Sequence, residues 1–117
     1  MNAGPTTTDA ENLQELPVND FSEIACFFAE DKEVFLLTYD NKRCIIPNSI
    51  EELSGKLDPK SFFRVNRQYI ISADAIRKVH NYFNFKLKVE IKGDTRLEII
   101  VSRSRTAAFK AWMNSEG

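Results

Sequence analysis

The sequence FFRVNRQYIIS, residues 62–72, decides the fold of this chain. Its polar residues Arg64, Asn66 and Arg67 stand between runs of aromatic and β-branched residues. Such runs fit a half-buried strand, whereas charged and amide side chains cost free energy when they are buried without partners. We therefore expect this segment to anchor itself in a core and to hold its polar residues outward.

The residues before this segment predict strands that are buried on much of both sides. Apolar residues crowd onto both strand faces between residues 18 and 39, and residues 34–37 read VFLL. A polar connection at 30–33 divides this stretch into two strands, and a turn at 40–41 leads into a third strand at 42–46. Alternation assigns the residues of the first strand to two faces, with Ile24, Cys26 and Phe28 on one and Ala25 and Phe27 on the other.

A short helix is predicted between residue 47 and the central segment. Pro47 ends the preceding strand because it lacks a backbone donor, and Asn48 or Ser49 can cap a helix that follows. The apolar positions have a spacing of three to four residues, as expected for one buried helix face. They are Ile50, Leu53 and Leu57.

More strands and a final helix follow the central segment. Residues 75–79 form a short strand candidate, and residues 86–92 alternate between apolar and charged side chains. A three-residue loop at 93–95 keeps the apolar set of this strand on the same face as that of the next. The apolar residues of the two strands are Leu87, Val89 and Ile91, then Leu97, Ile99 and Val101. An amphipathic helix then begins with Ser102 or Ser104 as its N-cap and runs to Met113.

These elements indicate a mainly β fold, with antiparallel sheets and two short helices. At 117 residues, 43% of them hydrophobic, the chain suffices for one core. We place the domain at residues 18–114. Residues 1–17 are rich in polar residues without an apolar period, and we expect a disordered linker or tail there.

Several functional classes are disfavoured by the residue content. The longest apolar runs fall short of the roughly 18 residues of a membrane span, and no export signal is recognisable, so we expect a cytoplasmic protein without membrane contact. Cys26, Cys44 and His80 lack metal-ligand spacing, and we expect reduced cysteines and an unpartnered surface histidine. The sequence has no phosphate-binding glycine loop or nucleophile elbow, so we expect neither an enzyme nor a cofactor.

The aromatic residues expected in the core are Phe62, Phe63, Tyr69 and Phe85.

Charge is distributed very unevenly along the chain. The formal net charge is −1, but residues 1–59 carry four bases and twelve acids, a balance of −8. Residues 60–110 carry twelve bases and four acids, a balance of +8. A polyanion responds to such a local excess rather than to the overall isoelectric point, so a nucleic-acid partner is compatible with this composition.

The central segment resembles the central motif of the LytTR-type DNA-binding domain of bacterial response regulators. In that family the motif reads roughly F-hydrophobic-R-V-H-R-S-Y-hydrophobic-V-N. Here Asn66 stands at the usual His, Gln68 at the usual Ser and Ser72 at the usual Asn. Residues 101–105, VSRSR, resemble a second family signature, and the likeness extends over residues 18–113.

The resemblance implies DNA binding through loops rather than through a recognition helix. An arginine fork can donate two hydrogen bonds to guanine, and an amide can pair with adenine in the same way. We assign base readout to Arg67 in the central motif, and phosphate contact to Arg103 near a helix start. The candidate DNA-binding residues are Lys32, Arg64, Asn66, Arg67, Gln68, Arg103, Ser104 and Arg105.

The resemblance also implies partners beyond this chain. Double-stranded DNA is the expected ligand, bound by a homodimer on repeated half-sites, and a receiver domain usually precedes such a domain. The alternative is a sheet-based sensory or protein-interaction module, for which the positive charge would be incidental. The discriminating feature is whether Arg64, Arg67, Arg103 and Arg105 lie on one face, as DNA binding requires, or are scattered, which would favour the alternative.

Overall fold

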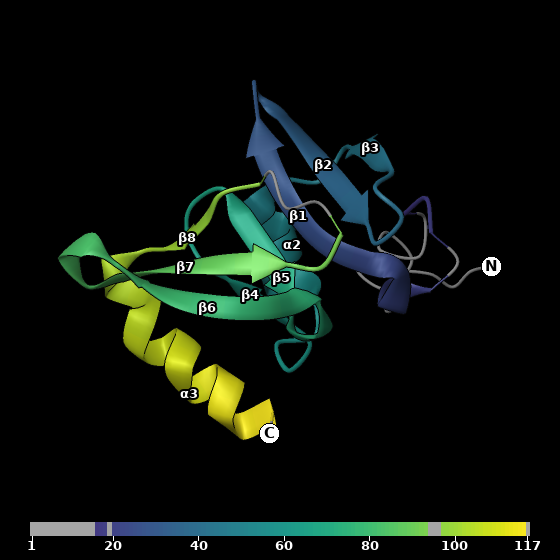
Figure 1. The fold of residues 1–117 in the computed structure, drawn as a ribbon. Helices are drawn as coiled ribbons and strands as arrows, with labels where there is room; N and C mark the ends of the chain where they lie inside the picture. The colour runs from purple at the N-terminus through teal and green to yellow at the C-terminus, as the bar shows by residue number, and fades with distance from the viewer. Residues whose placement is uncertain (1–15, 19, 94–96, 117) are drawn as a thin grey trace.

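The fold is described by a computed structural model for residues 16–18, 20–93 and 97–116. Within these residues, eight strands form two sheets in which every pairing is antiparallel (Figure 1). The larger sheet has the order β3-β2-β1-β5-β4, and its strands are β1 (Ile24–Glu30), β2 (Glu33–Thr38), β3 (Arg43–Ile46), β4 (Phe62–Arg64) and β5 (Tyr69–Ser72). The smaller sheet has the order β6-β7-β8, with β6 (Ile76–Tyr82), β7 (Lys86–Ile91) and β8 (Ile99–Val101). The predicted mainly β fold is confirmed.

Two α-helices complete the described part of the chain, α2 (Ile50–Lys56) and α3 (Thr106–Glu116). The Ser49 side chain accepts a hydrogen bond from the Glu52 backbone, and the Glu52 carboxylate accepts one from the Ser49 backbone, so α2 begins with a capping box. The predicted N-cap is thus Ser49. A short 3-10 turn, Arg103–Arg105, precedes α3, which therefore begins later than either predicted N-cap would place it.

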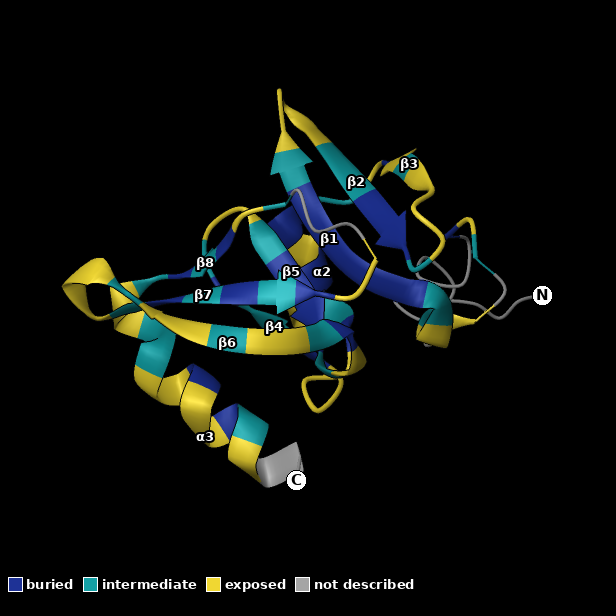
Figure 2. Cartoon of the chain, viewed as in Figure 1, coloured by how far each residue is buried: buried dark blue, intermediate teal, exposed yellow. Residues whose placement is uncertain are grey.

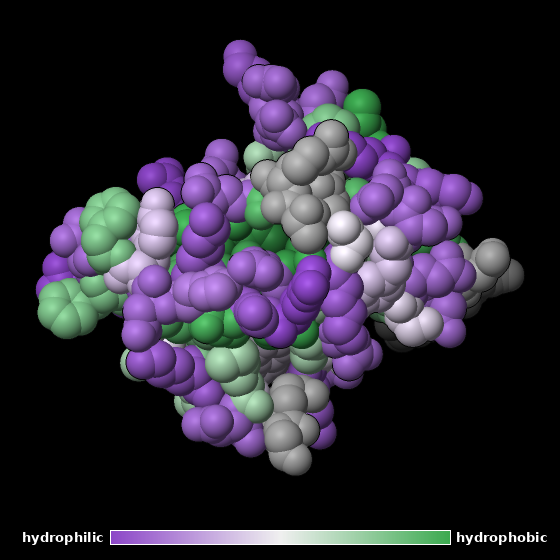
Figure 3. All heavy atoms as spheres, in the orientation of Figure 1, coloured by the Kyte–Doolittle hydropathy of each residue, from purple (hydrophilic) through white to green (hydrophobic). Residues whose placement is uncertain are grey.

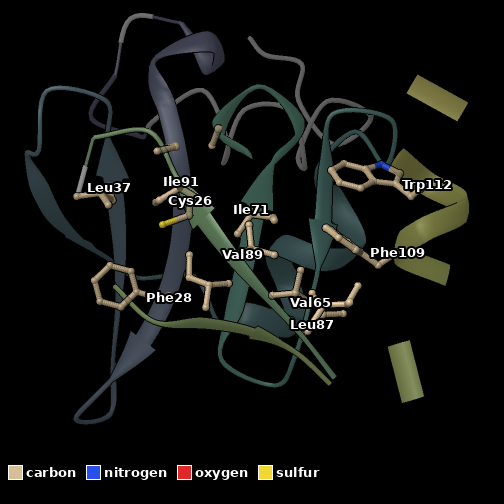
Figure 4. Close-up of a cluster of buried hydrophobic side chains, with 14 residues drawn as sticks. Cys26, Phe28, Leu37, Val65, Ile71, Leu87, Val89, Ile91, Phe109 and Trp112 are labelled. Carbon is tan, nitrogen blue, oxygen red and sulfur yellow. The ribbon is translucent and has the colours of Figure 1, made fainter. Parts of the chain in front are cut away.

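The larger sheet is buried on both faces, as the sequence predicts. One apolar cluster lies on the side of β6, β7, β8 and α3, and a second lies on the side of α2 (Figure 2). In Figure 4, Phe109 and Trp112 reach from α3 toward the first cluster, where Val65 and Leu87 lie. The Trp112 ring also donates a hydrogen bond from Nε1 to the Pro59 carbonyl at 2.9 Å. The two apolar clusters thus lie between three layers, which are the smaller sheet with α3, the larger sheet, and α2. The edges of the larger sheet can present loops to solvent.

A bulge in β1 changes the predicted assignment of faces. The β1–β2 register shifts between Ile24 and Cys26, because an extra residue stands on the β1 side. Ala25 and Cys26 therefore both belong to the first cluster, together with Phe28. Ile24 belongs to the second cluster with Phe27, so the prediction that it shares a face with Cys26 is wrong.

The smaller sheet confirms the predicted alternation of β7. Leu87, Val89 and Ile91 are buried, and β7 pairs with β8 so that Leu87 stands opposite Val101. The predicted three-residue loop at 93–95 lies partly outside the described residues, which omit 94–96.

The strand β6 is longer than the predicted 75–79 and includes His80. The His80 Nε2 atom lies 2.6 Å from Glu90 Oε2, so the expectation of an unpartnered histidine is wrong. This hydrogen bond lowers the pKa of the Glu90 carboxyl. The pair links the exposed faces of β6 and β7.

One aromatic residue that we predicted in the core is exposed. Phe62 is buried, and Phe63 and Tyr69 pack partly buried against the first cluster. Phe85 lies in the turn between β6 and β7, and 78% of its surface is exposed. Its neighbour Phe83 is 61% exposed. The core prediction is therefore wrong for Phe85.

Cys26 and Cys44 form no disulfide with each other, and Cys26 is buried whereas Cys44 is half-buried. No helix among the described residues is long and apolar enough to cross a membrane. The same residues contain no group of three or more side chains that could hold a metal ion.

Leu16 corrects the expectation for the N-terminal segment. Its side chain is only 5% exposed and belongs to the second cluster, although we had placed it in a tail that buries nothing. Most of that segment, residues 1–15, lies outside the described residues. Among the described residues, packing of the domain therefore begins at Leu16.

We predict that Leu16→Ala lowers the free energy of unfolding by about 2 kcal/mol, because it removes buried methyl groups and leaves a cavity. Urea denaturation of the full chain measures this change. Ile45→Ala is the matched control, since Ile45 is 60% exposed and its truncation should cost no more than about 0.5 kcal/mol. Equal stability of the two variants would contradict a packing role for Leu16.

Candidate nucleic-acid interface

An open groove of about 550 Å³ brings together most of the predicted site residues. It lies where the 65–68 loop between β4 and β5 meets the start of β7 and the segment from β8 into α3. Its lining residues are Asn66, Arg67, Gln68, Lys86, Ile100, Ser102, Ser104 and Arg105. These described lining residues include three cations and no carboxylate, so the groove favours an anion.

Backbone hydrogen bonds fix the 65–68 loop against both sheets. Val65 donates to the Tyr69 carbonyl at 3.0 Å, which closes the loop within the larger sheet. Ser102 donates to the Val65 carbonyl at 3.0 Å, which attaches the end of β8 to the loop. Ala29 near the end of β1 donates to the Gln68 carbonyl at 2.9 Å. The loop is thus held from three directions.

The Asn66 side chain holds the loop from within. Its Nδ2 atom donates to the Ile100 carbonyl at 2.6 Å. Its Oδ1 atom accepts from the backbone N–H groups of Gln68 at 2.7 Å and Tyr69 at 2.9 Å. The amide that we expected at a base edge is therefore directed into the protein, where it joins the two sheets.

The Arg64 side chain also hydrogen-bonds to the backbone of the 65–68 loop. Its Nε atom donates to the Asn66 carbonyl and its Nη2 atom to the Arg67 carbonyl, both at 3.1 Å. The Nη2 atom also lies 3.2 Å from Glu51 Oε2, and the side chain is only 16% exposed. Arg64 is therefore a positioning residue and does not share the exposed face of Arg67.

The Glu51 carboxyl is the partner of Arg64 outside the loop. A hydrogen bond from its own backbone N–H lowers its pKa, and the hydrogen bond and charge of Arg64 lower it further. The carboxylate is consequently the form that pairs with Arg64 near neutral pH. It also compensates a cation that would otherwise add to the charge of the loop.

Most of the predicted site residues that are exposed lie in the 65–68 loop and in residues 103–105. Arg67, Gln68 and Ser104 are exposed, and Arg105 is half-buried. Arg103 is exposed as well, but it does not line the groove, because its guanidinium lies over the Phe85 ring at 5.5 Å from the centroid. Lys32 lies in the β1–β2 turn and is not among the lining residues.

Sequence reasoning missed Lys86, which lines the groove. Alternation placed Lys86 among the lysines that face water. The β7–β8 register pairs Leu87 with Val101, which brings Lys86 beside the residues that follow β8. The β7–β8 register, had it been known, would have been enough to place Lys86 at the groove.

Comparison with known proteins shows the family of the chain. The family of the LytTr DNA-binding domain matches residues 15–114. The chain belongs to this LytTR family. Transcriptional regulatory protein YpdB of Escherichia coli K12 is 30% identical over 105 residues, which cover 89% of this chain and 41% of that protein. An uncharacterized response regulatory protein of Vibrio cholerae is 29% identical over 104 residues, covering 86% and 39% respectively.

A solved structure supports the LytTR fold. A LytTr DNA-binding domain from Bacillus cereus superposes with a TM-score of 0.70 at 20% identity, covering 80% of this chain and 83% of that one. This LytTR chain spans about two fifths of the length of the two regulatory proteins.

We predict that Asn66→Ala destabilises the domain by about 2–3 kcal/mol, because it removes one donor and one doubly used acceptor from a half-buried site. Urea denaturation measures the loss. Gln68→Ala is the matched control from the same loop, and its exposed side chain should contribute no more than about 0.5 kcal/mol. A stability of Asn66→Ala equal to that of the control would show that the amide does not hold the loop.

Proposed function

We propose that this LytTR domain binds double-stranded DNA with the groove described above, in a sequence-specific manner. The observation that carries the proposal is that Arg67 and Arg105 share one groove with Lys86, and no carboxylate stands among the described residues that line it. The positive balance of residues 60–110 supports the same partner. Two of the four arginines that were to separate DNA binding from a sensory or protein-interaction module, Arg67 and Arg105, meet in this groove, whereas Arg64 and Arg103 do not line it. The proposal of DNA binding therefore rests on the three cations of the groove rather than on all four arginines.

The roles of the site residues follow from their exposure. Arg67 stands on a loop braced by Asn66 and Arg64, so it loses little conformational freedom of its backbone on binding. An exposed guanidinium on such a loop can enter a groove of the DNA and donate two hydrogen bonds to a guanine, with Gln68 beside it. Arg105 and Lys86 contact phosphates on either side, together with Ser104. Lys32 contributes a more distant phosphate contact.

The α3 helix does not serve as a recognition helix in this proposal. Phe109 and Trp112 turn one face of α3 into the first cluster, and the helix begins at Thr106, directly after the groove residue Arg105. DNA is therefore bound by loops at the edges of the sheets. The proposal assigns the domain no catalytic reaction.

We also propose that the domain is the effector part of a transcriptional response regulator in the bacterial cytoplasm. The relatives are more than twice as long as the matched region, and one is named a response regulatory protein. A receiver domain N-terminal to residue 18 could bring two copies together on repeated half-sites. Sedimentation of the chain joined to its natural N-terminal neighbour, with and without phosphorylation, tests this arrangement.

We predict a salt dependence of about −4 to −5 for log affinity against log salt, because the positive excess of residues 60–110 would neutralise about five phosphates, with Arg105, Lys86 and Arg103 among the cations in contact. Fluorescence anisotropy with a duplex selected from a random pool gives the slope. Arg105→Ala should reduce its magnitude by about 1. Lys42→Ala is the charge-matched control, since Lys42 pairs with Asp40 at the other end of β2 from the 65–68 loop, and it should leave the slope unchanged. A slope near zero for the unsubstituted chain would exclude electrostatic DNA binding.

We predict that Arg67→Ala costs about 1–3 kcal/mol on the selected duplex and relaxes the preference at one base pair. Arg105→Ala should instead weaken the selected duplex and a scrambled one by the same factor. Both variants are measured on both duplexes. If Arg67→Ala weakens the two duplexes equally, Arg67 contacts phosphate and the base-reading role lies elsewhere.

A further inference from the structure

The turn between β6 and β7, residues 83–85, presents two phenyl rings to solvent. Among the described residues only three large hydrophobic side chains are exposed, and two of them are Phe83 and Phe85 in this turn. Figure 3 shows hydrophobic spheres among hydrophilic ones at the end of the molecule where Figure 1 shows this turn. Exposed phenyl rings cost free energy in water, and two in one short turn point to a partner surface.

The backbone of this turn is strained at the more exposed ring. Asn84 has φ 59° and Phe85 has φ 62°, both in the left-handed region. Asparagine tolerates this conformation, whereas for a bulky residue such as phenylalanine it is a genuine outlier. Glycine or asparagine at 85 would fit the turn better. The Phe85 ring therefore serves neither the core nor the turn, and strain of this kind is found where function requires it.

The turn is tied to the groove by one side chain and two cations. Thr106 Oγ1 at the start of α3 lies 3.1 Å from the carbonyl oxygens of both Phe85 and Ser102, which share its one hydroxyl hydrogen. Lys86 lines the groove, and its Nζ atom lies 5.3 Å from the centroid of the Phe83 ring. Arg103 lies over the Phe85 ring. The rings are thus held at one end of the groove with a cation beside each.

We propose that Phe85, together with Phe83 of the same turn, is an apolar wedge that contacts a base step of the DNA next to the segment held in the groove. Proteins that press apolar side chains against a base step partly unstack it and so gain contact surface. The cations beside the rings favour DNA over an apolar protein partner, because they would meet the phosphates that flank the step. This inference rests on the proposed DNA binding and adds to it a contact that the positive charges alone would not supply.

The test uses Phe85→Gly in the full chain. Glycine adopts positive φ without strain, so the melting temperature should stay the same or rise. Affinity for the selected duplex should fall about fivefold or more, which is the loss expected for one base contact with an aromatic ring. The salt slope should not change, because no cation is removed. Ile45→Ala, which truncates the third exposed hydrophobic residue on β3, should bind as tightly as the unsubstituted chain.

A second measurement locates the wedge on the DNA. Duplexes that carry 2-aminopurine at successive positions should brighten at one step when the unsubstituted chain binds, and should not brighten with Phe85→Gly. Affinity of Phe85→Gly within twofold of the unsubstituted chain overturns the wedge, and so does a loss of affinity without brightening at any step. Loss of self-association in sedimentation along with loss of affinity would instead assign the turn to a contact between two copies. If the unsubstituted chain binds no duplex, the proposed function itself fails, and this outcome is distinct from the others.

Discussion

The junction between the two sheets is the constraint on which this site depends. At this junction the Ser102 N–H donates to the Val65 carbonyl, and the Asn66 amide donates to the Ile100 carbonyl. Both bonds cross from the loop of the larger sheet to the last strand of the smaller one. The first apolar cluster fills the space behind them, with Val65 and Val101 fully buried. Because a packed core cannot deform continuously, the position of the loop relative to residues 102–105 is fixed by packing as well as by hydrogen bonds.

The polar residues of the central segment divide into two groups by what they contact. Arg64 and Asn66 are half-buried, and burial without partners would cost each of them free energy, so their donors are directed at carbonyls of the same loop and of β8. Arg67 lies beyond this bracing and faces solvent. When a long side chain on a rigid loop binds a ligand, the conformational entropy that is lost is mainly that of its own rotamers. Arg64 and Asn66 thus fix the backbone of the loop that carries Arg67.

Local patterns were sufficient wherever the burial of a residue depends on its near neighbours. The alternation of 86–92 and the spacing of Ile50, Leu53 and Leu57 predicted β7 and α2 correctly. The bulge at Ile24 and the packing of Leu16 depend on partners farther along the chain, and no local signal marks them. The extension of β6 to His80 depends on pairing within the β6–β7 hairpin, where residues 80–82 show no apolar alternation. The candidate site shows the same limit. Arg64 and Asn66 were predicted to contact DNA, and the motif alone did not reveal that their side chains hydrogen-bond to Glu51 and Ile100, 13 and 34 residues away.

The change from the histidine of the family pattern to Asn66 can be understood from these hydrogen bonds. The position needs a donor toward the Ile100 carbonyl and an acceptor for the N–H groups of Gln68 and Tyr69. A neutral imidazole has one donor and one acceptor nitrogen, and an amide offers the same pair on one carbon. The amide oxygen has two lone pairs and accepts both N–H groups, whereas the acceptor nitrogen of an imidazole has one, so asparagine fits this bond set better than histidine would. Asparagine also does not titrate, whereas a histidine ordinarily changes its charge between pH 5 and 8 and has no acceptor when protonated. The loop that carries Arg67 is therefore held in this chain by a bond set that does not change with protonation near neutral pH.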